Sequence, residues 1–241
     1  MQLDILAVGA HPDDVELCCA GTLAKLVKKD RKAGIIDLTE GELGTRGTRA
    51  IRLKEAKTAG SLLGCVRENL GIPDGNIEIN SVNVKKMIAV IRKYRPRMII
   101  IPHWHERHPD HVHAHHLCRE AWFYAGLRKI STTMNGHRQD PWRPDNYIHY
   151  MQWYEFTPSF IVDITDVYDV RLKAIKAHKS QFYNPGSREP TTKLSEESFL
   201  DFVATRAKTY GTKIGVKYAE PFYSVESIGI ADPLELMMFR G

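Results

Sequence analysis

The chain contains 241 residues, of which 43% are hydrophobic and 26% are charged. This balance is typical of a globular protein and excludes a disordered or fibrous chain. The 34 Lys and Arg residues outnumber the 29 Asp and Glu residues, and the resulting net charge of +5 is too small to indicate a nucleic-acid-binding protein.

Along the chain, short apolar segments alternate with segments of helical period, which predicts an α/β fold with a mostly parallel sheet flanked by helices. In the first half, the predicted elements in chain order are strand 3–8, helix 15–29, strand 33–38, helix 50–63, strand 65–70, a helix from 80 or 81 to 94, strand 98–101 and helix 110–125. A polar, Gly-rich loop is expected at 39–48 and a turn at 71–75. The residues expected on the inner face of helix 50–63 are Leu53, Ala56, Leu62 and Leu63.

The second half begins with a long loop, residues 131–146, which contains Gly136, Pro141 and Pro144. A loop of this length is expected either to close over a ligand or to form a subunit contact. The later predicted elements are strands 147–153 and 160–163 and helices 166–182 and 195–210. Because no repeat or linker interrupts this pattern, residues 1–241 are predicted to form a single domain.

Cellular location is indicated by the N-terminus and by cysteine usage. Residues 1–8 carry an acid and no basic segment, so no signal peptide is expected. No apolar run approaches the roughly 18 residues that span a bilayer, so no membrane partner is expected. The four cysteines contain no Cys-x-x-Cys pair, which favours free thiols in a reducing cytoplasm.

Two clusters of His and Asp follow predicted parallel strands. Residues 11–14 (His-Pro-Asp-Asp) follow the first strand, and residues 108–111 (His-Pro-Asp-His) follow strand 98–101. We expect the clusters to converge, because the carboxyl ends of parallel strands meet at the ligand-binding edge of an open sheet. Imidazole and carboxylate are ligands of catalytic zinc, and two adjacent carboxylates can supply one ligand and one general base.

Both clusters also have interpretations without this site. Asp13 and Asp14 precede a helix and could serve only as its cap and first-turn acid. His111 and His115 are four residues apart on one helical face, which is a rival way to bind a metal. Seven of the 11 histidines lie within residues 103–116, and most are expected to be solvated or structural. The histidines assigned no role are His103, His105, His113 and His116.

Motifs of other function classes are absent from the sequence. There is no GxxxxGK[ST], no GxGxxG after a strand and no GxSxG. The basic runs 25–32 and 92–97 lie at the C-terminal ends of predicted helices, where cations are favourable, and they contain no interleaved aromatic residues. No nucleic-acid partner is therefore expected.

Residues 10–14 together with residues 108–111 closely resemble the LmbE-like, or PIG-L, family of zinc-dependent N-deacetylases. Residues 37–42, Arg52 with Glu55, and residues 69–74 extend the similarity along most of the chain. The resemblance implies a Rossmann-like fold, a homo-oligomer such as a trimer or hexamer, and removal of acetyl groups from N-acetylglucosamine-type sugars.

Less specific motifs are most similar to one branch of that family. Arg95-Pro96, residues 180–182 (Ser-Gln-Phe) and residues 218–220 (Tyr-Ala-Glu) resemble the bacillithiol-biosynthesis enzymes, which deacetylate N-acetylglucosaminyl-malate. Pro221 stands where the resemblance leads us to expect a glycine. Proline restricts the backbone conformation there, which affects the edge of the expected substrate site. A chitobiose-type sugar, a thiol conjugate and a non-catalytic metal- or sugar-binding module are the alternatives.

The resemblance also implies roles for individual residues. The expected ligands of one Zn²⁺ per chain, with Fe²⁺ as an alternative, are His11, Asp14 and His111. Asp13 would be the general base for the attacking water. His108 would be the protonated partner that stabilises the oxyanion or donates to the leaving amine, and Asp110 would orient it.

Substrate contacts are expected from the loops next to these clusters. Arg52 would bind a carboxylate such as that of malate, although it could instead pair with Glu55 or Glu42 on a helix surface. Asp74 would accept sugar hydroxyls, unless it serves only the turn in which it lies. Glu42 and Arg46 are further candidates from loop 39–48. Cys18 and Cys19, behind the metal loop, are expected to be small buried hydrophobic residues.

Overall fold

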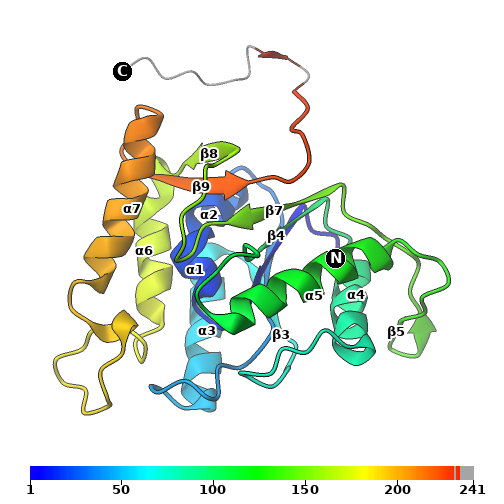
Figure 1. Cartoon of the computed structure of the whole chain (residues 1–241), viewed down its shortest axis with the longest axis horizontal. Helices are drawn as coiled ribbons and strands as arrows, with labels where there is room; N and C mark the ends of the chain where they lie inside the picture. The colour runs from blue at the N-terminus through cyan, green and yellow to red at the C-terminus, as the bar shows by residue number, and fades with distance from the viewer. Residues whose placement is uncertain (231, 234–241) are drawn as a thin grey trace.

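The computed structural model describes residues 1–230, 232 and 233 (Figure 1). The strands of its main sheet are β1 Ile5–Gly9, β2 Ala33–Asp37, β3 Val66–Asn69, β4 Met98–Ile101, β7 Asn146–Tyr150, β8 Phe160–Asp163 and β9 Ala219–Tyr223. They lie in the order β3-β2-β1-β4-β7-β9-β8. The strands from β3 to β7 are parallel, and β9 runs antiparallel to both of its neighbours. The predicted mostly parallel α/β sheet is confirmed.

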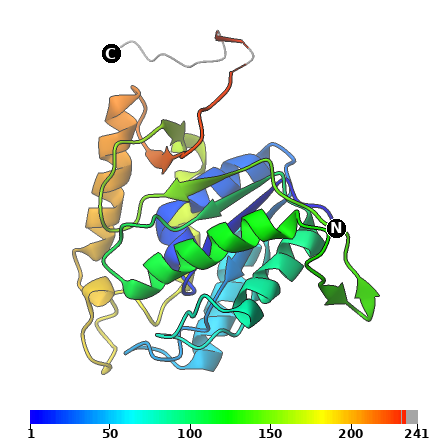
Figure 2. The ribbon, with the colours of Figure 1, turned by 45° about the vertical axis from the view of Figure 1, so that its right-hand side comes forward.

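Helices cover both faces of the sheet (Figures 1 and 2). They are α1 Asp14–Cys18, α2 Ala20–Lys28, α3 Arg49–Leu63, α4 Ser81–Tyr94, α5 Pro109–Ala125, α6 Tyr168–Ala177 and α7 Phe199–Lys213, with 3₁₀ turns η1 Thr165–Val167 and η2 Lys193–Ser195. Helices α4 and α5 pack on one face, and the other five pack on the opposite face. None of the helices in the described ranges is long and apolar enough to cross a membrane.

The central strand β1 shows why the sheet is buried on both faces. Ile5 and Ala7 point into the core beneath α1, α2 and α6, whereas Leu6 and Val8 point into the core beneath α4 and α5. A strand covered on both sides reads as a continuous apolar run, and this run identified β1 in the sequence.

Helix 15–29 of the sequence prediction is in fact two helices, α1 and α2, separated at Cys19. The Cys19 backbone has φ −144° and ψ 11°, outside the helical region. The chain restarts as α2 because the buried Glu220 carboxylate accepts hydrogen bonds from the backbone N–H groups of Gly21 (2.9 Å) and Thr22 (2.7 Å). This cap comes from the far end of the chain, so no local pattern marks it.

Strand β9 is absent from the elements that the sequence predicts, although it lies inside the sheet between β7 and β8. Its residue Pro221 lacks an N–H and argues against a central strand. The ladder between β7 and β9 covers only Tyr223 and Phe222, so β9 is paired at Pro221 on the β8 side alone. Proline is therefore tolerated at this position.

The expected loop 131–146 contains a small antiparallel hairpin of β5 Thr133–Met134 and β6 His137–Arg138. Asn135 and Gly136 at its turn have φ values of 52° and 78°, the conformation that two-residue hairpin turns require. The hairpin projects from the body of the molecule (Figure 2).

Helix predictions differ in how well they match. Asn80 caps α4 by accepting from the backbone N–H groups of Val82 and Asn83, which confirms the predicted start. The helices predicted at 166–182 and 195–210 are present as α6 and α7. Both start later than predicted because 3₁₀ turns precede them, and α6 ends earlier and α7 later than predicted. Leu62 is 45% exposed, so its assignment to the inner face of α3 was wrong.

Candidate metal centre

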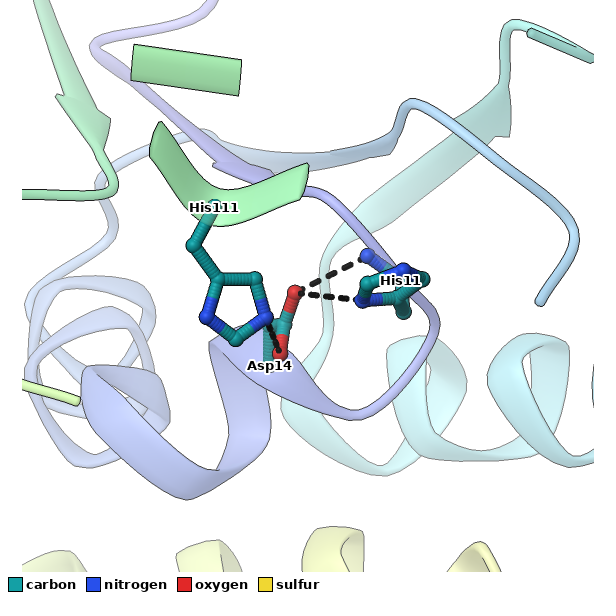
Figure 3. Close-up of side chains that lie close together, drawn as sticks. All are labelled: His11, Asp14 and His111. Atoms are coloured by element: carbon teal, nitrogen blue, oxygen red, sulfur yellow. Dashed lines mark hydrogen bonds and ion pairs between the residues drawn. The ribbon is translucent and has the colours of Figure 1, made fainter. Parts of the chain in front are cut away.

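The two His and Asp clusters meet at the carboxyl edge of β1 and β4, which are adjacent parallel strands. His11 follows β1, Asp14 begins α1, and His111 lies in the first turn of α5 (Figure 3). The two Asp14 carboxylate oxygens lie 3.6 Å from His11 Nδ1 and 3.3 Å from His111 Nε2. Ligands of a tetrahedral zinc ion, with bonds of about 2.0–2.1 Å, are about 3.3 Å apart. One ligand atom from each of the three residues lies within 4.8 Å of the other two, so the group could hold a metal ion.

Two further carboxylates fix the His11 ring. Its Nε2 lies 3.0 Å from Asp74 Oδ1 and 3.2 Å from Asp110 Oδ2, so these two acceptors hold a proton on Nε2 and leave Nδ1, beside Asp14, as the nitrogen that can bind a metal. Burial opposes a charged imidazole here, but hydrogen bonds to these carboxylates and to Asp14 outweigh it and raise the pKa of His11. The surroundings of the ring thus favour a positive charge.

The expected role of Asp110 needs correction. Its carboxylate contacts His11 and the backbone N–H of Gly75 (2.8 Å), so it orients His11 rather than His108. His108 is the N-cap of α5, and its Nδ1 accepts from the backbone N–H of Asp110 at 3.2 Å. Burial and the neighbouring His11 and His111 lower the pKa of His108.

Asp13 has the surroundings of a general base. Its side chain makes no capping hydrogen bond to α1, so the interpretation of Asp13 as only a helix cap is wrong. Burial raises the pKa of Asp13 to about 6, although the nearby Arg52 guanidinium opposes this rise. A base that titrates close to neutral pH is well matched to accepting a proton from water.

Arg52 lies beside this base. Its side chain is buried and donates to the backbone oxygens of Pro12 (2.7 Å) and Gly41 (3.0 Å), and it lies 3.3 Å from Asp13 Oδ2. Arg52 also lines the cavity, so the expected contact with a substrate carboxylate stays a prediction. Pairing with Glu55 is wrong, because Glu55 accepts from Ser180.

The other expected substrate contacts are divided. Arg46 is buried and donates to backbone carbonyls and a hydroxyl of residues 180–190, so it fixes that segment and does not line the cavity. Glu42 is exposed and accepts from the backbone N–H of Asp74. Asp74 does line the cavity; although burial acts in the opposite direction, hydrogen bonds from His11 and Leu43 lower its pKa to about 2.

The cavity above the metal cluster has a volume of about 380 Å³. Its lining includes Asp13, Asp14, His108 and His111. Apolar side chains, mainly from the start of α7 and the segment before it, also line it, and they are Leu194, Phe199, Phe202 and Val203. The cavity thus combines titratable groups with apolar surface.

Sequence analysis missed a third segment of the site, which follows β7. Gln152 lines the cavity, and its side-chain amide contacts both Asp14 and His111. Glu106, also unassigned, accepts from the backbone N–H groups of Trp153 (2.9 Å) and Tyr154 (3.3 Å). The position of Gln152 just after a parallel strand could have marked it as a site residue. The predicted strand 147–153 extended past the true end of β7 at Tyr150 and so placed Gln152 inside the strand.

His115 belongs to a different cluster. Its Nδ1 faces the backbone oxygen of Pro102 at 3.2 Å, and its ring packs against Trp104 and His149. The metal-binding groups among the described residues do not include it, so the His111–His115 alternative is not supported. Burial lowers the pKa of His115 to about 4 and that of His149 to about 3.

Comparisons with known proteins show which family the chain resembles in sequence and fold. The family model "PIG-L: GlcNAc-PI de-N-acetylase" matches residues 6–122. The chain is 32% identical over 240 residues to the diacetylchitobiose deacetylase of Thermococcus kodakarensis, covering 93% of this chain and 84% of that protein. The crystal structure of the conserved protein TT1542 from Thermus thermophilus superposes with a TM-score of 0.85 at 35% identity, covering 95% of this chain and 98% of that one. The N,N'-diacetylchitobiose deacetylase of Pyrococcus horikoshii gives 0.75 at 27% identity, with 90% and 82% covered.

Proposed function

The chain belongs to the PIG-L family of de-N-acetylases, and we propose that it is a metal-dependent hydrolase that removes the acetyl group from an N-acetylglucosaminyl compound. The observation that carries the proposal is the convergence of His11, Asp14 and His111 beside the buried carboxylate of Asp13. A binding module would need the three ligands alone. A carboxylate of raised pKa in the same cavity is what hydrolysis requires in addition.

Zn²⁺ is the metal that we propose, with Fe²⁺ as the alternative for the same ligands. Two imidazoles and one carboxylate form a three-ligand set, which leaves a position for water and substrate. A metal held there would polarise the amide carbonyl and lower the pKa of water.

The remaining steps fall to residues of the chain. Asp13 accepts the proton of the attacking water, and Arg52 holds its carboxylate in place. Water adds to the acetyl carbon, the C–N bond breaks, and acetate and a free amine are the products. The departing amine needs a proton, and Asp13 can return the one that it accepted from water. His108 lines the cavity; its pKa is lowered and its Nδ1 accepts from the backbone N–H of Asp110, so the neutral ring donates its Nε2–H to the carbonyl oxygen as charge develops there.

We propose N-acetylglucosaminyl-malate as the substrate, on the resemblance of residues 180–182 and 218–220 to the bacillithiol branch. Diacetylchitobiose is the second candidate. It is favoured by the similarity to the Thermococcus kodakarensis enzyme and by the contact between Arg52 and Asp13, because an arginine that already pairs with a carboxylate of the chain is less available to one on the substrate.

The test is amine release by metal-loaded protein from N-acetylglucosaminyl-malate, diacetylchitobiose and free N-acetylglucosamine. Strong preference for the malate conjugate supports the first candidate, and turnover of the neutral sugars instead supports the second. No release from any of the three by protein with bound metal would overturn the proposed function.

A further inference from the structure

Gln152 lies at the centre of the site although no role follows for it from the reaction as described. It comes two residues after the end of β7, and its side chain lines the cavity. Its Nε2 lies 2.5 Å from Asp14 Oδ1 and 3.2 Å from His111 Nε2. The two N–H groups of one amide therefore face two of the three metal ligands.

The carboxylate fixes which way this amide points. With the amide reversed, its carbonyl oxygen would face the Asp14 carboxylate, and two acceptors would repel each other. In the observed orientation, Gln152 Oε1 is buried and has no hydrogen-bond partner in the described structure. An unpaired buried oxygen reduces stability, so we infer that the donor contacts of the amide nitrogen offset this cost.

The backbone that carries Gln152 is anchored on both sides. Arg206 of α7 donates to the backbone oxygen of Gln152, and the buried carboxylate of Glu106 accepts from the next two backbone N–H groups. These hydrogen bonds fix the backbone at Gln152, so its amide approaches Asp14 from a fixed position.

We propose that Gln152 is a positioning residue of the metal site, whose amide holds the Asp14 carboxylate in the orientation that binds the ion. This inference rests on the proposed metal-dependent function. A donor on one carboxylate oxygen restricts rotation of the group, so Asp14 is already oriented before the metal binds. The contact of the amide with His111 Nε2 must open at that point, because the ion takes the lone pair of this nitrogen. Loss of such a partner is expected to weaken metal binding by about 10–100-fold.

The test compares Gln152→Met with the control Gln139→Met. Gln139 is buried whereas Gln152 is half-buried, but the two share the same pattern: Gln139 Nε2 donates to the backbone oxygen of Ala89 (2.9 Å), and its buried Oε1 has no partner. Gln139 lies outside the cavity. Zn²⁺ affinity is measured by competition with a chelator, and the ligand field by visible absorption of the Co²⁺-loaded proteins. We expect weaker binding and an altered Co²⁺ spectrum for Gln152→Met alone.

Gln152→Asn extends the test if the methionine variant does not fold. Asparagine keeps the amide but is one methylene shorter, so it is expected to show the same loss of affinity. Affinity within twofold of the original protein in either Gln152 variant, or an equal loss in Gln139→Met, would overturn the inference. Failure of the unmodified protein to bind metal or release amine would instead overturn the proposed function.

Discussion

At the scale of single residues, Asp13 is held in a conformation that its type rarely adopts. Its φ of 113° is unusual for any residue other than glycine and costs about 1–3 kcal/mol. Arg52 counteracts this cost by bonding to the backbone oxygen of Pro12 and lying beside the Asp13 carboxylate. In this conformation the carboxylate lines the cavity and does not cap the N-terminus of α1.

Replacement of Asp13 by asparagine is expected to lower turnover by about 10²–10⁴-fold, the usual contribution of a general base. The isosteric amide cannot accept the proton of water, while the three metal ligands are unchanged. Amine release and bound zinc are measured on the same preparation, with Asp140→Asn at an exposed site as the control. Full activity of Asp13→Asn would remove Asp13 as the base.

Arg52→Ala is expected to reduce turnover of the malate conjugate and of neutral sugars by the same factor, because Arg52 acts through Asp13. Leaving a buried carboxylate without its partner also costs about 3–5 kcal/mol of unfolding free energy. Arg49→Ala is the control, since Arg49 lies on the same helix but is exposed and paired with Glu40. A loss confined to the malate conjugate would support the carboxylate-binding role.

These residues also show what a sequence reveals about a site. The grouping of His11, Asp14 and His111 could be predicted because His11 and Asp14 follow β1 and His111 lies in the first turn of the helix that follows β4, and both strands have a plain apolar run. The roles of Arg52 and Gln152 could not, because they depend on partners 39 and 138 positions away in the chain. Type and spacing identify ligands, whereas only the folded chain identifies what holds them.

At the scale of elements, a cluster of imidazoles joins α5 to β7. His103, His115 and His149 are buried, and their rings pack with Trp104 and Tyr223. Burial and the neighbouring imidazoles lower the pKa of His149 to about 3, so the packing requires the neutral ring.

Metal-free protein should therefore lose stability as the pH falls below about 6.5. The unfolded chain takes up a proton on His149 there, whereas the folded chain does not until about pH 3. Over the 1.5 units from pH 6.5 to 5, this site costs ~2 kcal/mol. Urea unfolding at pH 7.5 and 5 measures the loss, and His149→Asn should show less of it than the exposed control His137→Asn. Equal losses in both variants would exclude His149 as the source.

Elements were predicted where their signal is local and missed where it is not. The caps and apolar periods of α4 and β4 lie within their own residues, so both were found. The break at Cys19 and the strand β9 depend on each other, since Glu220 of β9 caps α2. Pro221 argues locally against a strand at β9, and the continuous helical period of residues 15–29 argues against a break at Cys19. The tertiary contacts of Glu220 outweigh both local signals.

At the scale of the whole molecule, metal binding should stabilise the fold. Zinc at about 100 times its dissociation constant adds about 2.7 kcal/mol, which for a chain of this size raises Tm by about 5–10 °C. Calorimetry with zinc and with a chelator measures the shift. His111→Ala should abolish the shift and His115→Ala should retain it. The opposite result would move the ligand assignment to His115.

Residues far along the chain support α1 and α2, the two helices that follow His11. The backbone oxygen of Leu17 accepts from Arg171 (2.6 Å) and Arg206 (2.9 Å), and the cap of α2 comes from Glu220. During synthesis, these supports therefore leave the ribosome 154 to 199 residues later than the groups that they contact. A nascent chain that ends before Arg206 carries His11 and Asp14 without these contacts. We therefore expect tight metal binding only after the chain has been synthesised through Glu220.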